Sequence, residues 1–380
     1  MISSSIHLLF SLLLCFPSLW NSSHEPNLPR PSGRYPVGTA IFHLIDQKRK
    51  DPIDSTRWRE LMVQIWYPAS SQQGFSKAPY IPDSALINAM LNEEYLNISP
   101  RAVESWRNLL THSFLEAPIV TSPRLIPLVL FSHGFGVSRS NYTSILEDLA
   151  SNGFIVAAID HPASGLTILP DGHVISFVPD PLGPDGKTDA MIKDASFVLS
   201  ALLDKDQEAG RFAKRIDAQR IGMFGHSLGG AAALGIGRVD HRFRACANMD
   251  GYPFGRIPIE GLHQPSLMLL QRPGEPIHIS DQMRFERDSL WSAIISKQRT
   301  DAYIATIKGT SHFSFSDLPF LVPDSLMIRN GATITPQLGH EIVTHILRVF
   351  FSKYFNDAKD VSLEDIAKIY PDVIFERLAH

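Results

Sequence analysis

Short apolar runs alternate with amphipathic stretches along most of the chain. The apolar runs predict strands at Leu128–Ser132, Phe154–Asp160, Arg220–Phe224, Arg244–Asp250, Ser266–Leu270 and Tyr303–Ile307. The stretches between them carry apolar residues at helical spacing and predict helices at Asn141–Ser151, Asp189–Leu203, Leu228–Gly237 and Asp281–Ile295, with a last helix that begins at Pro336. Regular alternation of strands and helices indicates an α/β protein with a mostly parallel central sheet flanked by helices.

The chain before residue 127 has a less regular pattern. Two β-rich runs, around Thr39–Ile45 and Leu61–Tyr67, predict an antiparallel edge of the sheet. Residues 79–118 are predicted to form a helical insert, because apolar residues recur there at helical spacing and Ser99-Pro100 is typical of a helix start. Further along, Pro170-Asp-Gly172 predicts the turn of a hairpin-like excursion.

The two ends of the chain are expected to lie outside the main domain, which we place at residues 37–355. Ile6–Phe16 is almost entirely apolar but too short to cross a bilayer, so residues 1–20 predict a signal peptide and a secreted or periplasmic protein. No Lys or Arg precedes this run, and a lipid anchor on Cys15 is the alternative, which the bulky Leu14 disfavours. Residues 21–36, rich in Pro, Ser and Asn, predict an N-terminal arm, and residues 356–380 a C-terminal tail.

Composition narrows the class of protein. The 380 residues are 44% hydrophobic and 19% charged, which fits a globular protein with a large core. The net charge is −4 without long runs of either sign, so no nucleic-acid partner is expected. Two cysteines, Cys15 and Cys246, cannot form a disulfide framework, and Cys246 is expected in the core.

Residues 225–230 carry the most specific chemical signal. They read Gly-His-Ser-Leu-Gly-Gly, directly after one predicted strand and directly before a predicted helix. Gly-x-Ser-x-Gly in that setting is typical of a nucleophile elbow, in which a strained turn lifts the serine hydroxyl above the sheet. Gly225 and Gly229 fit because side chains there would collide with neighbouring elements. Ser227 is therefore the predicted nucleophile.

A serine hydroxyl needs a base, and the base needs an acid that holds its tautomer. In folds of this kind the order along the chain is Ser, acid, His, with each residue at the carboxyl end of a strand. His312 follows the last predicted strand and is the predicted base. Asp250 ends the strand after the elbow and is the predicted acid, with Glu275, after the next strand, as its rival.

The tetrahedral intermediate of acyl transfer also needs hydrogen-bond donors for its oxyanion. The backbone N–H of Leu228, directly after the nucleophile, is one predicted donor. The other is the N–H of Phe135, in the turn Ser132-His-Gly-Phe-Gly136 that follows a predicted strand. The glycines of this turn let its backbone approach a substrate closely.

A resemblance to a known family is carried by motifs spread over most of residues 35–355. They are Tyr35-Pro-Val-Gly38, Phe42-His-Leu44, Val63-Gln-Ile-Trp-Tyr-Pro68, Phe131-Ser-His-Gly-Phe-Gly136, Gly153-Phe-Ile-Val-Ala-Ala158, Gly225-His-Ser-Leu-Gly-Gly230, Met249-Asp250 and Gly309–His312. Together they resemble the platelet-activating factor acetylhydrolase family, of the lipoprotein-associated phospholipase A2 type. The chain departs from the animal enzymes at Asp160-His-Pro162 and in Phe313–Ile328.

The resemblance implies an α/β-hydrolase fold, with the insert placed before the half that carries the nucleophile. It implies Ser227, Asp250 and His312 as the catalytic triad, with Phe135 and Leu228 as oxyanion donors, and it favours Asp250 over Glu275. Members of the family hydrolyse short or oxidised sn-2 acyl chains of phospholipids without calcium. A phospholipid or small ester is thus the expected substrate, and a secreted carboxylesterase, lipase or polyester hydrolase is the alternative.

Two aromatic residues after the predicted base are candidate substrate contacts. Phe313 and Phe315 belong to an apolar segment that could line an acyl pocket, touch a lipid surface or be buried core. No cofactor or metal is expected, because the His340–His345 stretch, which imitates a zinc motif, places its two histidines on different sides of a helix. A non-catalytic binding protein on the same fold is the third hypothesis.

Overall fold

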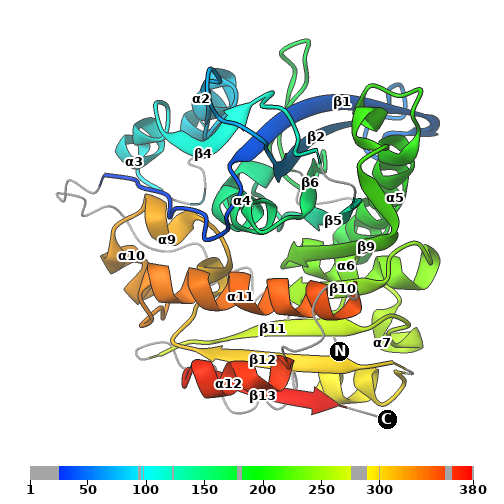
Figure 1. The fold of residues 1–380 in the computed structure, drawn as a ribbon, viewed down its shortest axis with the longest axis vertical. Helices are drawn as coiled ribbons and strands as arrows, with labels where there is room; N and C mark the ends of the chain where they lie inside the picture. Colours follow the sequence, from blue (N-terminus) through cyan, green and yellow to red (C-terminus); the bar gives the residue numbers. More distant parts are fainter. Residues whose placement is uncertain are drawn as a thin grey trace.

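The computed structural model describes residues 25–92, 96, 98–121, 124–177, 182–274, 289–298, 300–355 and 362–378. The predicted signal peptide at 1–20 lies outside these residues, as does the first part of the helix predicted at Asp281–Ile295. The described part forms one large sheet with helices packed around it (Figure 1). No helix in this described part is long and apolar enough to span a bilayer.

The large sheet has eleven strands in the order β13-β12-β11-β10-β9-β5-β6-β2-β1-β4-β3 within the described residues. Their bounds are β1 Val37–Lys50, β2 Trp58–Pro68, β3 Lys77–Pro79, β4 Leu110–Leu115, β5 Ile126–Ser132, β6 Ile155–Asp160, β9 Ile216–His226, β10 Ala245–Met249, β11 Ser266–Arg272, β12 Ala302–Lys308 and β13 Val373–Leu378. All neighbours from β6 to β12 pair in parallel, whereas β1 and β13 pair antiparallel with β2 and β12. The mostly parallel sheet and the antiparallel pairing of β1 with β2 are as predicted. The expectation that this pair forms the edge of the sheet was wrong, because β4 and β3 lie beyond β1.

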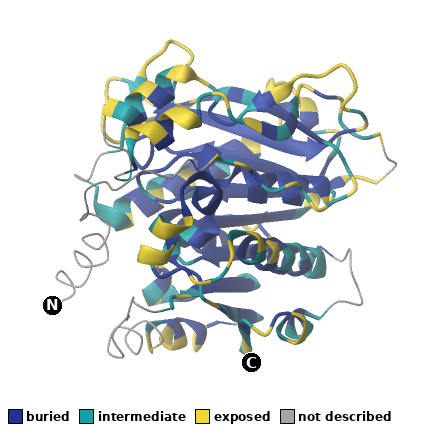
Figure 2. Cartoon of the chain, turned by 90° about the vertical axis from the view of Figure 1, so that its left-hand side faces the viewer, coloured by how far each residue is buried: buried dark blue, intermediate teal, exposed yellow. Residues whose placement is uncertain are grey.

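Helices cover both faces of this sheet, because each face carries its own hydrophobic cluster. The helices are α2 Ser84–Asn92, α3 Pro100–Ser105, α4 Thr143–Ser151, α5 Gly183–Leu203, α6 Leu228–Val239, α7 Ile257–Glu260, α9 Leu318–Leu321, α10 Asp324–Arg329, α11 Pro336–Tyr354 and α12 Ile366–Ile369. Short 3-10 turns are η2 Arg139–Tyr142, η3 Ala209–Phe212, η4 His312–Phe315 and η5 Leu363–Asp365. Helices α4 and α11 supply residues to one cluster, and α5 and α6 to the other. The strands between them are almost wholly buried (Figure 2).

The predicted insert at 79–118 is helical only in part. Helix α3 begins at Pro100, with the Ser99 hydroxyl accepting a hydrogen bond from the Ala102 N–H, as the sequence indicated, but it ends at Ser105. Residues 110–115 then form β4, where Thr111 and Ser113 face inward while Leu110 and Leu115 are exposed. The apolar side chains of β4 are exposed or half-buried while Thr111 and Ser113 are buried, the reverse of the usual strand pattern, and this reversal explains the mistaken helix prediction.

Both segments expected outside the main domain are tied to it where they are described. In the arm, Asn27 N–H donates to the Phe320 carbonyl and Ser32 N–H to the Asp148 carboxylate. In the segment expected as a C-terminal tail, Val373–Leu378 extends the sheet as β13. The hairpin predicted at Pro170-Asp-Gly172 is formed by β7 (Thr167–Ile168) and β8 (Val174–Ile175).

Candidate active site

Ser227 lies at the sharp turn between β9 and α6. Its backbone angles are φ 54° and ψ −120°, in a region that residues with side chains rarely occupy. The turn is possible only with glycines around it, since a Cβ at Gly225 would lie 2.2 Å from the Gly229 carbonyl oxygen, and one at Gly229 would lie 2.1 Å from the Ser132 carbonyl oxygen. The strain and the two glycines are the features of a nucleophile elbow.

The candidate base and acid meet although they are far apart in the chain. His312 Nδ1 lies 2.6 Å from Asp250 Oδ2. Asp250, at φ 53°, follows β10 directly, and its other carboxylate oxygen accepts from the Gln271 N–H at 3.0 Å. The Asp250 side chain is 7% exposed and that of His312 32%, so the acid is sheltered while the ring stays accessible.

The elbow and the acid are joined through the backbone. Ser227 N–H donates to the Met249 carbonyl at 2.9 Å, one residue before Asp250. A Cβ at Gly251 would lie 2.1 Å from the Ser227 carbonyl oxygen, which shows how closely the two turns pack. Among the described contacts, no hydrogen bond joins Ser227 Oγ to the His312 ring; such bonds often tighten only when substrate is bound.

A second histidine holds the segment of the base in place. His226 Nε2 donates to the His312 carbonyl at 3.0 Å, since a carbonyl can only accept, and His226 Nδ1 then accepts from the Tyr142 hydroxyl at 2.8 Å. The two imidazole rings lie 4.4 Å apart between centroids. Burial, reinforced by the neighbouring His312, keeps the pKa of His226 well below its usual value, so His226 is neutral. The sequence did not predict this support of the His312 segment by His226.

The two predicted oxyanion residues lie in one small hydrophobic cluster. Leu228 begins α6, and Phe135 packs beside it against Met191 and Ala232. Gly134 brings this loop to the nucleophile, because a Cβ there would lie 3.3 Å from Ser227 Cβ. The structure therefore gathers the elbow, the turn at 132–136 and the Asp250–His312 pair at one edge of the sheet.

The two candidate substrate contacts have different surroundings. The half-buried Phe313 ring meets the His312 ring edge-on, with centroids 5.9 Å apart. The Phe315 ring is fully buried and stacks on His226 at 6.2 Å. Phe313 thus lies half-buried beside the candidate base, whereas Phe315 packs on the histidine that holds the base segment. Glu275, the rival acid, lies outside the described residues.

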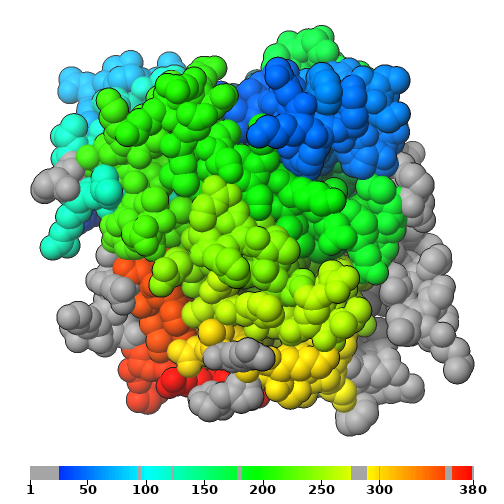
Figure 3. Space-filling model, turned by 90° about the vertical axis from the view of Figure 1, so that its right-hand side faces the viewer, coloured from blue at the N-terminus to red at the C-terminus, as the bar shows by residue number. Residues whose placement is uncertain are grey.

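A cavity of about 590 Å³ lies elsewhere on the molecule, in the groove between α5, α6 and the segment before α7, on the face drawn in Figure 3. Its lining includes Lys193, Arg238 and Phe254 but none of the triad candidates. Among the described residues, no group of three or more His, Cys, Asp or Glu side chains could hold a metal ion.

Comparison with known proteins places the chain in a family. A family model described as platelet-activating factor acetylhydrolase, isoform II, matches residues 20–167 and 191–368. The chain belongs to this family. The unmatched segment, 168–190, contains β8 and the start of α5. Two of its residues contact the Phe135 ring: the Phe177 ring centroid lies 5.4 Å from that of Phe135, and Lys187 Nζ lies 5.5 Å from it.

Individual relatives and a solved structure agree with this assignment. A probable 1-alkyl-2-acetylglycerophosphocholine esterase of Arthroderma benhamiae is 29% identical over 258 residues, covering 62% of this chain and 61% of that protein. A platelet-activating factor acetylhydrolase of Gallus gallus is 22% identical over 358 residues, covering 82% of each chain. A ferulic acid esterase from Streptomyces cinnamoneus superposes with a TM-score of 0.77 at 29% identity, over 92% of this chain and 99% of that one. These findings confirm the predicted α/β-hydrolase fold and are consistent with the predicted class of enzyme, a carboxylic ester hydrolase.

Proposed function

We propose that the chain is a serine hydrolase that cleaves carboxylic esters through an acyl-enzyme. The observation that carries the proposal is the 2.6 Å contact between Asp250 and His312 beside a serine held at φ 54° on a strand-to-helix turn. Strained backbone is retained where the surrounding structure requires it, often at reactive residues. A buried carboxylate on Nδ1 leaves His312 Nε2 as the ring nitrogen able to take a proton.

Each residue then has a defined step. His312 Nε2 accepts the Ser227 hydroxyl proton while Oγ bonds to the ester carbonyl carbon, and Asp250 holds the imidazolium that forms. The Leu228 and Phe135 N–H groups donate to the oxyanion. The C–O bond to the leaving alcohol breaks as His312 returns the proton to that oxygen. Water, deprotonated by His312, then bonds to the acyl carbonyl carbon. The C–O bond to Ser227 Oγ breaks as His312 returns the proton to Oγ, which releases the acid and restores Ser227.

For the substrate we propose phospholipids with a short or oxidised sn-2 acyl chain. Membership in the acetylhydrolase family and the name of the Arthroderma relative support this choice. A second candidate is a broader carboxylesterase, and two observations favour it. The chain is similar to a ferulic acid esterase, and Phe135 and Phe177 form an aromatic pair beside the nucleophile turn. A lipid surface is the proposed site of action for the first candidate.

A substrate panel decides between the candidates. Purified protein is assayed with p-nitrophenyl esters of increasing chain length, with methyl ferulate, and with acetyl and long-chain sn-2 phosphatidylcholines. The first candidate predicts that the sn-2 acetyl phospholipid has the highest kcat/KM and that the long-chain phospholipid is a poor substrate. A higher kcat/KM for methyl ferulate, or for small esters alone, favours the second. No hydrolysis of any ester contradicts both and leaves a binding protein.

Secretion completes the proposal. The apolar run Ile6–Phe16 supports removal of residues 1–20 as a signal peptide. The full chain is expressed in a secreting host, and the N-terminus of the protein recovered from the medium is sequenced. Cleavage near residue 20 is expected, and retention of the intact chain inside the cell contradicts it.

A further inference from the structure

A second Ser–His–Asp series of hydrogen bonds lies beneath the turn at 132–136. Ser132 Oγ is 2.9 Å from His161 Nε2, and His161 Nδ1 is 2.9 Å from Asp194 Oδ2. All three residues are fully buried, so no substrate reaches this serine. Ser132 is, however, the last residue of β5, where the turn 132–136 begins. This geometry fits a support for the turn rather than a second active site.

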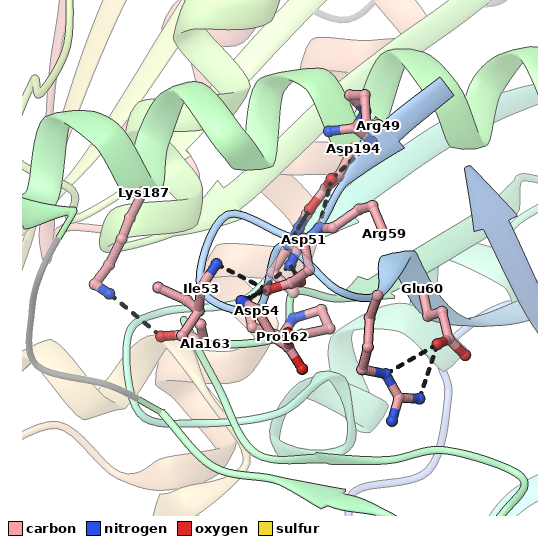
Figure 4. A network of polar contacts seen from close by, with 12 residues as sticks. Arg49, Asp51, Ile53, Asp54, Arg59, Glu60, Pro162, Ala163, Lys187 and Asp194 are labelled. Atoms are coloured by element: carbon pink, nitrogen blue, oxygen red, sulfur yellow. Dashed lines mark hydrogen bonds and ion pairs between the residues drawn. The ribbon is translucent and has the colours of Figure 1, made fainter. Parts of the chain in front are cut away.

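This series of hydrogen bonds is anchored at Asp194, its acidic end. Arg59, on β2, donates to both carboxylate oxygens of Asp194, through Nε at 3.1 Å and Nη2 at 2.6 Å, and Arg49 pairs with the same carboxylate (Figure 4). Burial alone would raise the pKa of Asp194, but the charge and hydrogen bonds of Arg59 outweigh it and lower that pKa. The carboxylate is therefore ionised and accepts from His161 Nδ1–H. His161 Nε2 then accepts a hydrogen bond from the Ser132 hydroxyl.

His133 continues this network into the turn, and its tautomer follows from its partners. The backbone N–H of His161 donates to His133 Nε2 at 3.0 Å, so that nitrogen carries no proton. His133 Nδ1 must then carry the proton, and it donates to the Gly134 carbonyl at 2.7 Å. Burial, with the neighbouring His161, lowers the pKa of His133 to about 3, which keeps the ring neutral.

A single peptide unit connects the His133–Gly134 hydrogen bond to the active site. The Gly134 carbonyl and the Phe135 N–H belong to the same planar trans peptide and so point in opposite directions. The carbonyl is held inward on His133, which turns the N–H away from the buried network. Ser227 lies close to Gly134, since a Cβ there would sit 3.3 Å from Ser227 Cβ. The turn is also fixed at the Gly134 N–H, which donates to the Tyr142 hydroxyl at 3.2 Å.

We propose that His133 is a positioning residue, whose Nδ1–H bond to the Gly134 carbonyl aims the Phe135 N–H at the developing oxyanion. The Asp194–His161 pair holds the His133 ring in place, because the backbone N–H of His161 donates to His133 Nε2. Gly165 packs on the same ring, because a Cβ there would lie 2.4 Å from His133 Cε1. This proposal rests on the proposed function, since it assigns a role in stabilising the oxyanion of that reaction.

Two substitutions at His133 separate its two hydrogen bonds. In His133→Asn the amide nitrogen takes the place of Nδ1 and can still donate to the Gly134 carbonyl. In His133→Gln the amide reaches the place of Nε2 and can accept from the His161 N–H, but the donor to Gly134 is lost. We expect His133→Gln to lower kcat on p-nitrophenyl acetate by about 10²-fold with KM changed less than about threefold, and His133→Asn to retain at least tenfold more kcat than His133→Gln.

A matched control distinguishes positioning from general damage to the core. His340, on α11, is another buried histidine, and His340→Gln alters it without touching the turn. His340→Gln is expected to lower the melting temperature while leaving kcat within about threefold. Equal kcat losses in His133→Asn and His133→Gln, or a loss that appears in KM rather than kcat, overturn the proposal.

The wild-type protein gives a test that needs no variant. Nitrogen-15 spectra of the histidine rings at neutral pH should show His133 as the neutral Nδ1–H tautomer, and a protonated or Nε2–H ring overturns the proposal. The control Ser227→Ala distinguishes failure of the proposed function from failure of the positioning role. If Ser227→Ala retains ester hydrolysis, the proposed function fails; if it is inactive and the two His133 variants lose kcat equally, only the positioning role fails.

Discussion

Asp250 Oδ2 and His312 Nδ1 lie 2.6 Å apart although 62 residues separate them in the chain. Asp250 follows β10 and His312 follows β12, and β11 lies between these two parallel strands. Parallel strands present all their carboxyl ends at one edge, and in open α/β sheets this edge is where ligands bind. The pair therefore forms because both residues leave the sheet at the same edge as the elbow.

Replacing the nucleophile tests the proposed chemistry by kinetics. Ser227→Ala removes the attacking oxygen but keeps the turn, and we expect kcat to fall by about 10⁴- to 10⁶-fold. The fold should persist, because only one hydroxyl is lost. Circular dichroism and p-nitrophenyl acetate turnover are measured on the same preparation. Hydrolysis near the wild-type rate by a folded variant contradicts the role of Ser227.

Replacing the acid tests which carboxylate orients the base. Asp250→Asn keeps the size of the side chain but no longer fixes the required tautomer of His312, and a fall in kcat of about 10⁴-fold is expected. Glu275→Gln is the matched comparison and should stay much closer to wild type. A greater loss in Glu275→Gln than in Asp250→Asn moves the acid to Glu275.

The elbow glycines can be tested against a glycine in a roomy site. Gly225→Ala places a methyl group 2.2 Å from the Gly229 carbonyl oxygen and is expected to destabilise the protein by about 1–3 kcal/mol or more and to lower activity. Gly339→Ala, in α11, finds its nearest neighbour at 3.5 Å and should stabilise by about 0.5–1 kcal/mol. Urea unfolding of both variants makes the comparison, and similar stabilities would argue against the packing described for the elbow.

Two buried carboxylates predict how stability depends on pH. Glu147 accepts from the Ser113 hydroxyl and Asp317 from the Ser144 hydroxyl and N–H, so they join β4, α4 and the segment after η4. Burial raises the pKa of Asp317 to about 7, and burial together with the Asp317 charge raises that of Glu147 to about 7. In the unfolded chain both titrate at about 4. The native state then holds protons that the unfolded state has released, so stability falls as pH rises from about 4 to 7 and levels off above.

A neutral variant of Glu147 should flatten this fall. Glu147→Gln cannot ionise, so its free energy of unfolding relative to wild type should improve by roughly 1–3 kcal/mol between pH 5 and pH 8. Urea unfolding at the two pH values measures the change. Glu104→Gln, at an exposed position on α3, is the control and should leave the pH dependence unchanged. The same pH slope in Glu147→Gln and wild type would mean that Glu147 is ionised in the native protein.

Local sequence patterns were enough to predict the strands and the turn that position the candidate site. The parallel strands that end near Ser132, Phe224 and Met249 are continuous apolar runs, and the elbow has its own short motif. The positions of β4 and β13 were missed, because their pairing depends on distant strands and β4 buries polar side chains against Glu147.

The buried network behind His133 was missed for a related reason, since its members lie up to 135 residues apart in the chain. One signal was present. Asp194 lies among Met191, Ala195 and Val198 on the apolar face of a helix, where an acidic residue requires a buried cationic partner. Arg59, in a strand, could have been matched to it only with the fold in hand.

The central claim is that Ser227 itself forms the covalent bond, and labelling followed by peptide mass spectrometry tests it most directly. The protein is treated with a fluorophosphonate, digested, and the modified residue identified. We expect a single adduct on Ser227, loss of ester hydrolysis in proportion to labelling, and no adduct in Ser227→Ala. Inactivation accompanied by an adduct on another residue, with Ser227 unmodified, would contradict the proposed mechanism.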